Sequence, residues 1–93
     1  MTPQTAALVR ISGRVQGVAF RAWTEGRARQ LGLEGWVKNE PDGSVLALIG
    51  GPQAQVQAMI EAFHSGPPWA EVRKVELAPA DPGDVPPGFE IIR

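Results

Sequence analysis

The sequence predicts an α+β domain in which an antiparallel sheet carries two helices on one face. Segments that alternate like half-buried strands and segments with apolar residues at helical spacing follow one another in the order β-α-β-β-α-β. That order is typical of the ferredoxin-like, split βαβ sandwich, and a short extra strand is expected at the C-terminus. A length of 93 residues, of which 43% are hydrophobic, suits one domain over residues 1–93.

The first strand is expected over residues 6–12, where Val9 and Ile11 alternate with polar side chains and should face the core. The first helix is expected over residues 20–31, because apolar residues recur there at helical spacing. Gly32 follows at the position of a helix C-terminal glycine.

A hairpin and a second helix are expected next. Strands over residues 33–39 and 44–49 flank the turn Glu40-Pro41-Asp42-Gly43, in which proline presets one dihedral angle and Asp-Gly tolerates positive φ. The break Gly50-Gly51-Pro52 should end the strand and begin the helix. This helix carries an apolar stripe at i, i+3, i+4 and i+7 that we assign to the core, namely Val56, Met59, Ile60 and Phe63.

The remaining strands are less regular. Residues 71–77 predict a strand with Val75 and Leu77 in the core, although Val72 breaks the alternation and leaves the register uncertain. A short final strand is expected at residues 89–93, after a proline-rich loop.

The strand alternation leaves apolar residues on the sheet face opposite the helices. A partner or a second copy could bind there, but we favour cover by long polar neighbours and by the proline-rich loop. The residues expected on this face are Leu8, Trp36, Leu46, Leu48 and Ile92.

Composition excludes several kinds of chemistry. The chain has no cysteine, so it has neither a disulfide nor a thiolate nucleophile, and a single His64 cannot form a histidine metal site. A net charge of −1 argues against broad attraction to nucleic acid or anionic membranes. The N-terminus lacks the features of a signal peptide and no apolar run reaches membrane-spanning length, so we expect a cytoplasmic protein that contacts no membrane.

The most informative stretch is residues 13–21, Gly-Arg-Val-Gln-Gly-Val-Ala-Phe-Arg, between the first strand and the first helix. Gly13 and Gly17 allow backbone conformations in which successive N–H groups turn toward one point. Arg21 stands at the positive end of the helix dipole. The stretch therefore suits a phosphate-binding loop, although spacing alone favours the more common alternative, a plain strand-to-helix turn.

Few other residues offer catalytic chemistry. No serine lies in a nucleophile elbow, and His64 is better explained as a residue at a helix C-terminus. Asp81 and Asp84 lie in the proline-rich loop, where turn formation explains them better than metal binding. Asn39 ends the second strand, where its amide either caps the turn or holds a water molecule, and spacing alone favours the turn.

Two blocks together resemble the acylphosphatase signature. They are residues 13–21 and Gly35-Trp36-Val37-Lys38-Asn39, the latter followed by Asp42-Gly43-Ser44-Val45. The resemblance covers nearly the whole chain, because later landmarks of the family follow in the same order, namely Gly50-Gly51-Pro52, the second helix, Gly66-Pro67 and the run from Ala70 to Val75. It implies a small ferredoxin-like enzyme that hydrolyses the carboxyl–phosphate bond of acyl phosphates without a metal or an organic cofactor.

The resemblance also implies a role for each site residue. Arg21 would bind the phosphoryl group and Asn39 would position the attacking water, as the two catalytic residues. The chain departs from the family pattern at Glu40, where many vertebrate members carry threonine, and a carboxylate near the site could lower substrate affinity. The loop backbone would form the substrate-binding cradle through Arg14, Val15, Gln16, Gly17, Val18, Ala19 and Phe20.

A second function from another class stays open, a non-catalytic anion-binding or protein-interaction module that uses the open sheet face. We favour the enzyme, acting as a monomer on a small-molecule acyl phosphate and without a nucleic acid partner. The sequence identifies neither the physiological acyl phosphate nor, firmly, the oligomeric state.

Overall fold

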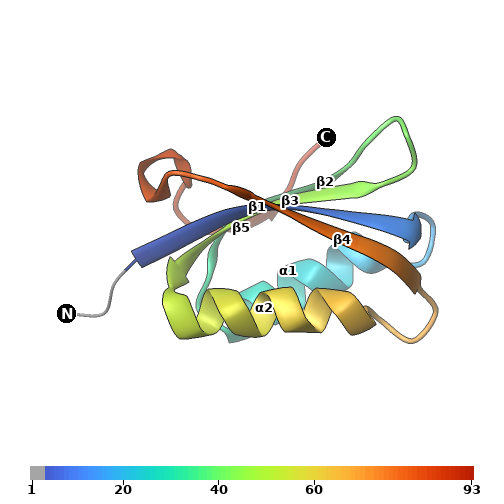
Figure 1. Cartoon of the computed structure of the whole chain (residues 1–93), viewed down its shortest axis with the longest axis horizontal. Coiled ribbons are helices and arrows are strands. Elements are labelled where there is room, and N and C mark those ends of the chain that lie inside the picture. The colour runs from blue at the N-terminus through green and yellow to red at the C-terminus, as the bar shows by residue number, and fades with distance from the viewer. Residues whose placement is uncertain (1–3) are drawn as a thin grey trace.

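The computed structural model describes residues 4–93 as five strands and two α-helices (Figure 1). No helix of this part of the chain is long and apolar enough to cross a membrane. The predicted β-α-β-β-α-β order with an extra C-terminal strand is confirmed. The elements are β1 (Gln4–Arg14), α1 (Phe20–Gln30), β2 (Glu34–Asn39), β3 (Val45–Pro52), α2 (Gln53–Ser65), β4 (Glu71–Pro79), a short 3-10 helix (Pro82–Asp84) and β5 (Phe89–Ile91).

The strands form a single sheet in the order β4-β1-β3-β2-β5. The four strands of the predicted motif pair antiparallel throughout, β1 with β3 and β4, and β2 with β3. The extra strand β5 runs parallel to β2, so the complete sheet is mixed. Both helices lie on one face of this sheet, below it in Figure 1.

The core lies between the sheet and the helices. Val9 and Ile11 of β1 are fully buried, as predicted. Phe20 of α1 stacks on Phe63 of α2, with ring centroids 6.2 Å apart and planes 9° apart. This aromatic contact joins the two helices beneath the sheet. The whole stripe predicted for α2 is buried as well, namely Val56, Met59, Ile60 and Phe63.

The strand β3 does not end at Ile49 as predicted but continues through Pro52. It continues because β1 begins earlier than expected, at Gln4, and pairs with all three residues of the expected break. A side chain at Gly50 would meet Val85 of the proline-rich loop at 2.9 Å, so this glycine permits close packing inside a strand. Pro52 then acts as the N-cap of α2.

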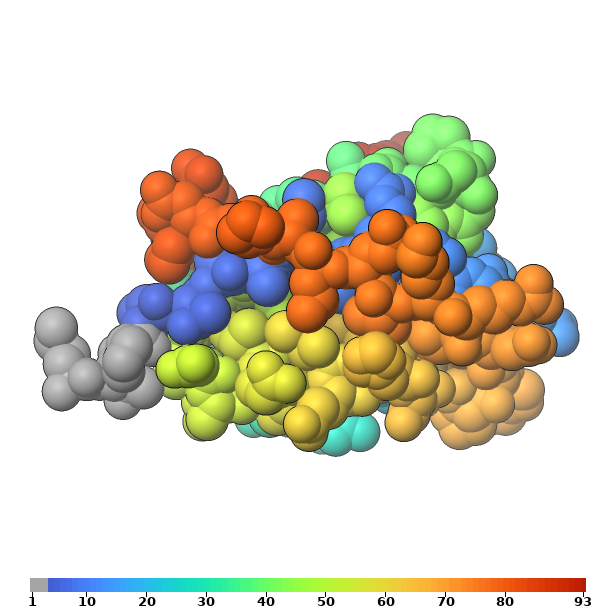
Figure 2. Space-filling view, in the orientation of Figure 1, coloured from blue at the N-terminus to red at the C-terminus, as the bar shows by residue number. Residues whose placement is uncertain are grey.

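The strand β4 departs furthest from prediction. Val72 and Val75 pack against the core, whereas Leu77, predicted to be buried, is 56% exposed. A register shift at Gly13 leaves Arg73 without a cross-strand partner, which explains why Val72 and Val75 face the same side despite their spacing. Since β4 is an edge strand, and lies in orange across the surface in Figure 2 with no strand beyond it, Leu77 has little cover.

The apolar residues of the opposite sheet face are buried or half-buried. The Lys38 ammonium lies over the Trp36 ring at 5.4 Å from its centroid, and Val85 approaches Gly50 from the proline-rich loop. Lys38 therefore covers part of Trp36, and the proline-rich loop covers β3 at Gly50. The apolar residues of this face are Leu8, Trp36, Leu46, Leu48 and Ile92.

Candidate active site

The chain leaves β1 through a loop at residues 15–19 and enters α1 at Phe20. Gly17 has a φ of 75° and Ala19 a φ of 61°. This left-handed conformation is free of strain for glycine but costs alanine on the order of 1 kcal/mol. Ala19 is the N-cap of α1, its side chain makes no capping hydrogen bond, and the first turn holds no acidic residue. The positive end of α1 is therefore uncapped at this loop.

The loop also holds unused hydrogen-bond donors. Within residues 4–93, no acceptor is present for any backbone N–H from Val15 to Ala19. The N–H groups of the first turn of α1 have no intrahelical acceptor either, as at every helix start. A cluster of such donors at a helix N-terminus is suited to bind an anion.

A cavity of about 220 Å³ lies beside these donors. It brings Arg21 of α1 next to Asn39 at the end of β2, and Ile91 of β5 completes one wall. The predicted catalytic pair, from separate elements, thus shares one small space with part of the loop. The lining residues are Val15, Gly17, Ala19, Phe20, Arg21, Ala22, Asn39 and Ile91.

The two polar side chains in this cavity have no ion-pair partner among residues 4–93. Arg21 forms no ion pair with any residue that the structure describes. The Oδ1 atom of Asn39 is buried and has no hydrogen-bond partner among residues 4–93. Asn39 does not cap the hairpin turn, the role that spacing alone favours, because Asp42 accepts from the Ser44 N–H at 2.9 Å and fills that role.

The side chain of Gln16 anchors the loop. Its Nε2 atom donates to the carbonyl oxygens of Glu40, at 2.9 Å, and Ser44, at 2.8 Å. Sequence reasoning gave Gln16 only a backbone role. A long amide side chain between two glycines was the only available signal, and it does not show which carbonyl groups the amide meets.

The Glu40 carboxylate is paired with Arg10 and does not border the cavity. Its Oε1 lies 3.5 Å from Nη2 of Arg10, on the sheet face opposite to Val9 and Ile11. Arg10 also lies 3.6 Å from Asp42 Oδ2. Glu40 therefore does not place its carboxylate at the site as expected, because the strand alternation directs the Glu40 side chain to the other face of the sheet.

Asp42 belongs to the same network at the hairpin turn. Hydrogen bonds from the hydroxyl and the backbone N–H of Ser44, with a smaller contribution from the charge of Arg10, hold the pKa of Asp42 below its ordinary value of 3.8. The Ser44 hydroxyl in turn accepts from Arg10 Nη1 at 2.8 Å. This network fixes the turn that follows Asn39.

Not every predicted cradle residue borders the cavity. Arg14 is exposed at the end of β1 and Val18 packs partly against the core, and both border a separate hollow beside Trp69. Ile91 does line the cavity and was missed, because its place depends on β5 pairing with β2.

The other polar candidates have structural roles. His64 is exposed in the last turn of α2, as expected for a helix C-terminal residue. Asp81 accepts from the Gly83 N–H at 2.9 Å and caps the short 3-10 helix. In the part of the chain that the structure describes, no three His, Asp or Glu side chains are grouped to hold a metal ion.

Comparisons with known proteins identify the family of the chain. Residues 7–91 match the family model described as Acylphosphatase. A Rhizobium meliloti protein named Acylphosphatase is 56% identical over 88 residues, which cover 95% of this chain and 93% of the relative.

Solved structures of acylphosphatases have the same fold as this chain. An acylphosphatase from Coxiella burnetii superposes with a TM-score of 0.90 at 34% identity, over 96% of this chain and 93% of the other. An acylphosphatase from Bacillus subtilis superposes with a TM-score of 0.91 at 32% identity, over 98% of this chain and 100% of the other. The chain therefore belongs to the acylphosphatase family of enzymes.

Proposed function

We propose that this enzyme hydrolyses small acyl phosphates to a carboxylate and inorganic phosphate, by in-line attack of water on phosphorus. The observation that carries the proposal is the shared cavity, where the Arg21 cation, unpaired loop N–H groups and the unpartnered Asn39 oxygen meet. The cavity thus combines groups that suit an anion with a hydrogen-bond acceptor that suits a water molecule.

The phosphoryl group binds to Arg21 and to the loop. A guanidinium group donates two parallel hydrogen bonds to phosphate oxygens. The N–H groups of residues 15–19 and the uncapped start of α1 oppose the remaining negative charge. Burial of the cavity wall at Val15 and Phe20, each 1% exposed, strengthens these interactions by excluding water from one side.

Asn39 positions the nucleophile. Its Oδ1 accepts a hydrogen bond from a water molecule and directs the water's lone pair at phosphorus, opposite the leaving group. No strong base is needed, because the transition state of phosphoryl transfer is loose and a carboxylate is a good leaving group. Alignment and charge stabilisation therefore supply most of the rate enhancement.

The test is hydrolysis of benzoyl phosphate with a chelator present. Arg21→Gln and Asn39→Ala should each lower kcat/KM at least about 100-fold, the scale of a lost transition-state contact, while the urea midpoint stays near that of the wild type. Arg27→Gln is the matched control, since Arg27 lies on the same helix but stacks on Trp23 at 5.9 Å and does not border the cavity. A wild-type protein without activity above background would refute the proposal, and loss of activity on chelation would refute its metal-free mechanism.

A further inference from the structure

A second, shallow hollow adjoins the cavity that holds Arg21. It is bordered by Arg14, Gly17, Val18, Ala19 and Trp69, and it shares Gly17 and Ala19 with that cavity. The backbone that would hold the phosphoryl group is therefore also one wall of this hollow.

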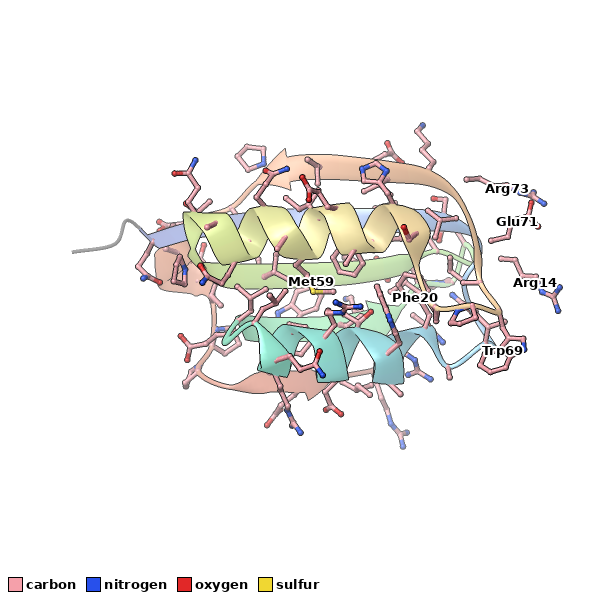
Figure 3. The ribbon with its side chains drawn as sticks, turned by 90° about the horizontal axis from the view of Figure 1, so that it is seen from below. Arg14, Phe20, Met59, Trp69, Glu71 and Arg73 are labelled. Carbon is pink, nitrogen blue, oxygen red and sulfur yellow. The ribbon has the colours of Figure 1, made fainter. Side chains whose placement is uncertain are left out.

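The segment between α2 and β4, which carries Trp69, lies at the same end of the sheet as the loop after β1 (Figure 1). In Figure 3, Arg14 and Trp69 both stand at this end of the molecule, whereas Phe20 and Met59 point into the interior. Two residues far apart in sequence thus border one hollow.

Trp69 is unusually exposed for an indole. It is 76% exposed, more than any other large apolar side chain among residues 4–93. Trp23 and Trp36 are half-buried and each packs beneath a cation, whereas no described cation stacks on Trp69. The backbone nearby is fixed, because Pro67 is buried and its carbonyl accepts from the Ala70 N–H at 3.0 Å. The hollow therefore has a solvent-facing aromatic wall that stands on an ordered turn.

Arg14 offers an unused cation beside this wall. Its cross-strand neighbour is Glu71, but the Glu71 carboxylate lies 3.4 Å from Arg73 Nε instead. Arg14 itself forms no ion pair within the described residues. An aromatic face next to a free guanidinium suits a carboxylate that carries an apolar body.

The chemistry of the reaction requires a place for such a group beside the phosphoryl group. In-line attack requires the acyl group to lie on the side of phosphorus opposite to the water. Asn39, which would position the water, borders the cavity that holds Arg21 and does not border the hollow, which begins across Gly17 and Ala19. As the bond from phosphorus to the acyl oxygen breaks, its electron pair stays on that oxygen to give the carboxylate, and the attacking water releases a proton to solvent.

We propose that this hollow is the subsite for the acyl group, and that Trp69 is its specificity residue, selecting acyl phosphates whose acyl group has a planar, apolar face. The inference rests on the proposed function. Arg14 lies where the departing carboxylate forms.

The experiment compares kcat/KM for benzoyl phosphate and acetyl phosphate, which share the reacting group and differ in the acyl body. Trp69→Ala should lower the value for benzoyl phosphate about tenfold, the scale of one apolar contact in a pocket, and change the value for acetyl phosphate less than about twofold. Trp69→Phe keeps a planar ring and should restore most of the preference. Competitive inhibition by inorganic phosphate should not change in either variant.

Leu77→Ala is the matched control, because Leu77 is another exposed apolar residue but borders neither the cavity nor this hollow. If Trp69→Ala leaves the ratio of the two kcat/KM values unchanged in an active enzyme, the subsite is refuted and the proposed function stands. If the wild type hydrolyses neither compound, the proposed function fails and the subsite fails with it.

Discussion

The Nε2 atom of Gln16 donates to the carbonyl oxygen of Ser44 over 2.8 Å, between residues 28 apart in sequence. The same atom donates to the carbonyl oxygen of Glu40 at 2.9 Å. One amide thereby ties the loop that leads to Arg21 to the strand end that carries Asn39. We therefore expect this contact to help set the relative placement of the two proposed catalytic residues.

Replacing Gln16 should affect both stability and turnover. Gln16→Ala removes two hydrogen bonds, each worth about 0.5–1.5 kcal/mol, and frees the loop from the hairpin. We expect a lower urea midpoint and a lower kcat for benzoyl phosphate. Gln57→Ala, at an exposed position of α2, is the control and should alter neither quantity. An unchanged kcat in Gln16→Ala would show that this anchor does not position the site.

Replacing Arg21 and replacing Asn39 should have different effects on the affinity for inorganic phosphate. Arg21→Gln removes charged hydrogen bonds worth about 1.5–3 kcal/mol, so calorimetric titration should show at least about tenfold weaker binding of inorganic phosphate. Asn39→Ala should leave phosphate affinity within about twofold, since its proposed contact is to the water and not to the phosphoryl group. Equal losses of phosphate affinity in the two variants would contradict this division of roles.

Two glycines outside the site test whether a positive φ, and not lack of space, makes a glycine necessary. A side chain at Gly26 or at Gly32 would meet no atom within 4 Å, but only Gly32 has a positive φ, of 70°. Gly26→Ala should therefore stabilise α1 by about 0.5–1 kcal/mol, whereas Gly32→Ala should destabilise the protein by about 1 kcal/mol. Urea unfolding measures both. A change of the same sign in the two variants would contradict the conformational explanation.

Asp42 should make stability depend on pH in the acid range. Because Ser44 holds the pKa of Asp42 below 3.8 in the folded state, the ionised form stabilises the protein above pH 3.8. That contribution is lost as the pH falls from 3.8 through the lowered value.

The variant Asp42→Asn isolates this contribution. It should be less stable than the wild type at about pH 7, and the difference should shrink at about pH 2, in urea unfolding at both pH values. Asp84→Asn controls for removal of one exposed charge, because the Asp84 side chain accepts no hydrogen bond within residues 4–93. A deficit in Asp42→Asn that is equal at both pH values would contradict the assignment.

Local patterns predicted most of the fold. The alternation around Val9 and Ile11 follows the two-residue repeat of a strand, and the stripe on α2 follows the 3.6-residue repeat of a helix. Each pattern therefore predicted correctly which side chains are buried. The register of β4 could not be predicted in this way, since the shift at Gly13 is a property of strand pairing. The same holds for Leu77, whose exposure follows from its place on an edge strand.

The same distinction between local patterns and long-range contacts applies to the candidate site. The two glycines and Arg21 lie in one short stretch, so sequence reasoning could single out the loop, whereas the family resemblance was needed to favour phosphate binding there and to give Asn39 a role. The contacts of Gln16 and the placement of Ile91 and Trp69 depend on segments that meet only in three dimensions. No local pattern marks such residues.

In the proposed mechanism, water attacks phosphorus and the carboxylate leaves. Hydrolysis of benzoyl phosphate in water enriched in the heavy oxygen isotope, followed by mass analysis of both products, tests it most directly. We predict that the isotope enters inorganic phosphate and that benzoate stays unlabelled. Label in benzoate would mean attack at the carbonyl carbon, and would contradict the roles proposed for Arg21 and Asn39.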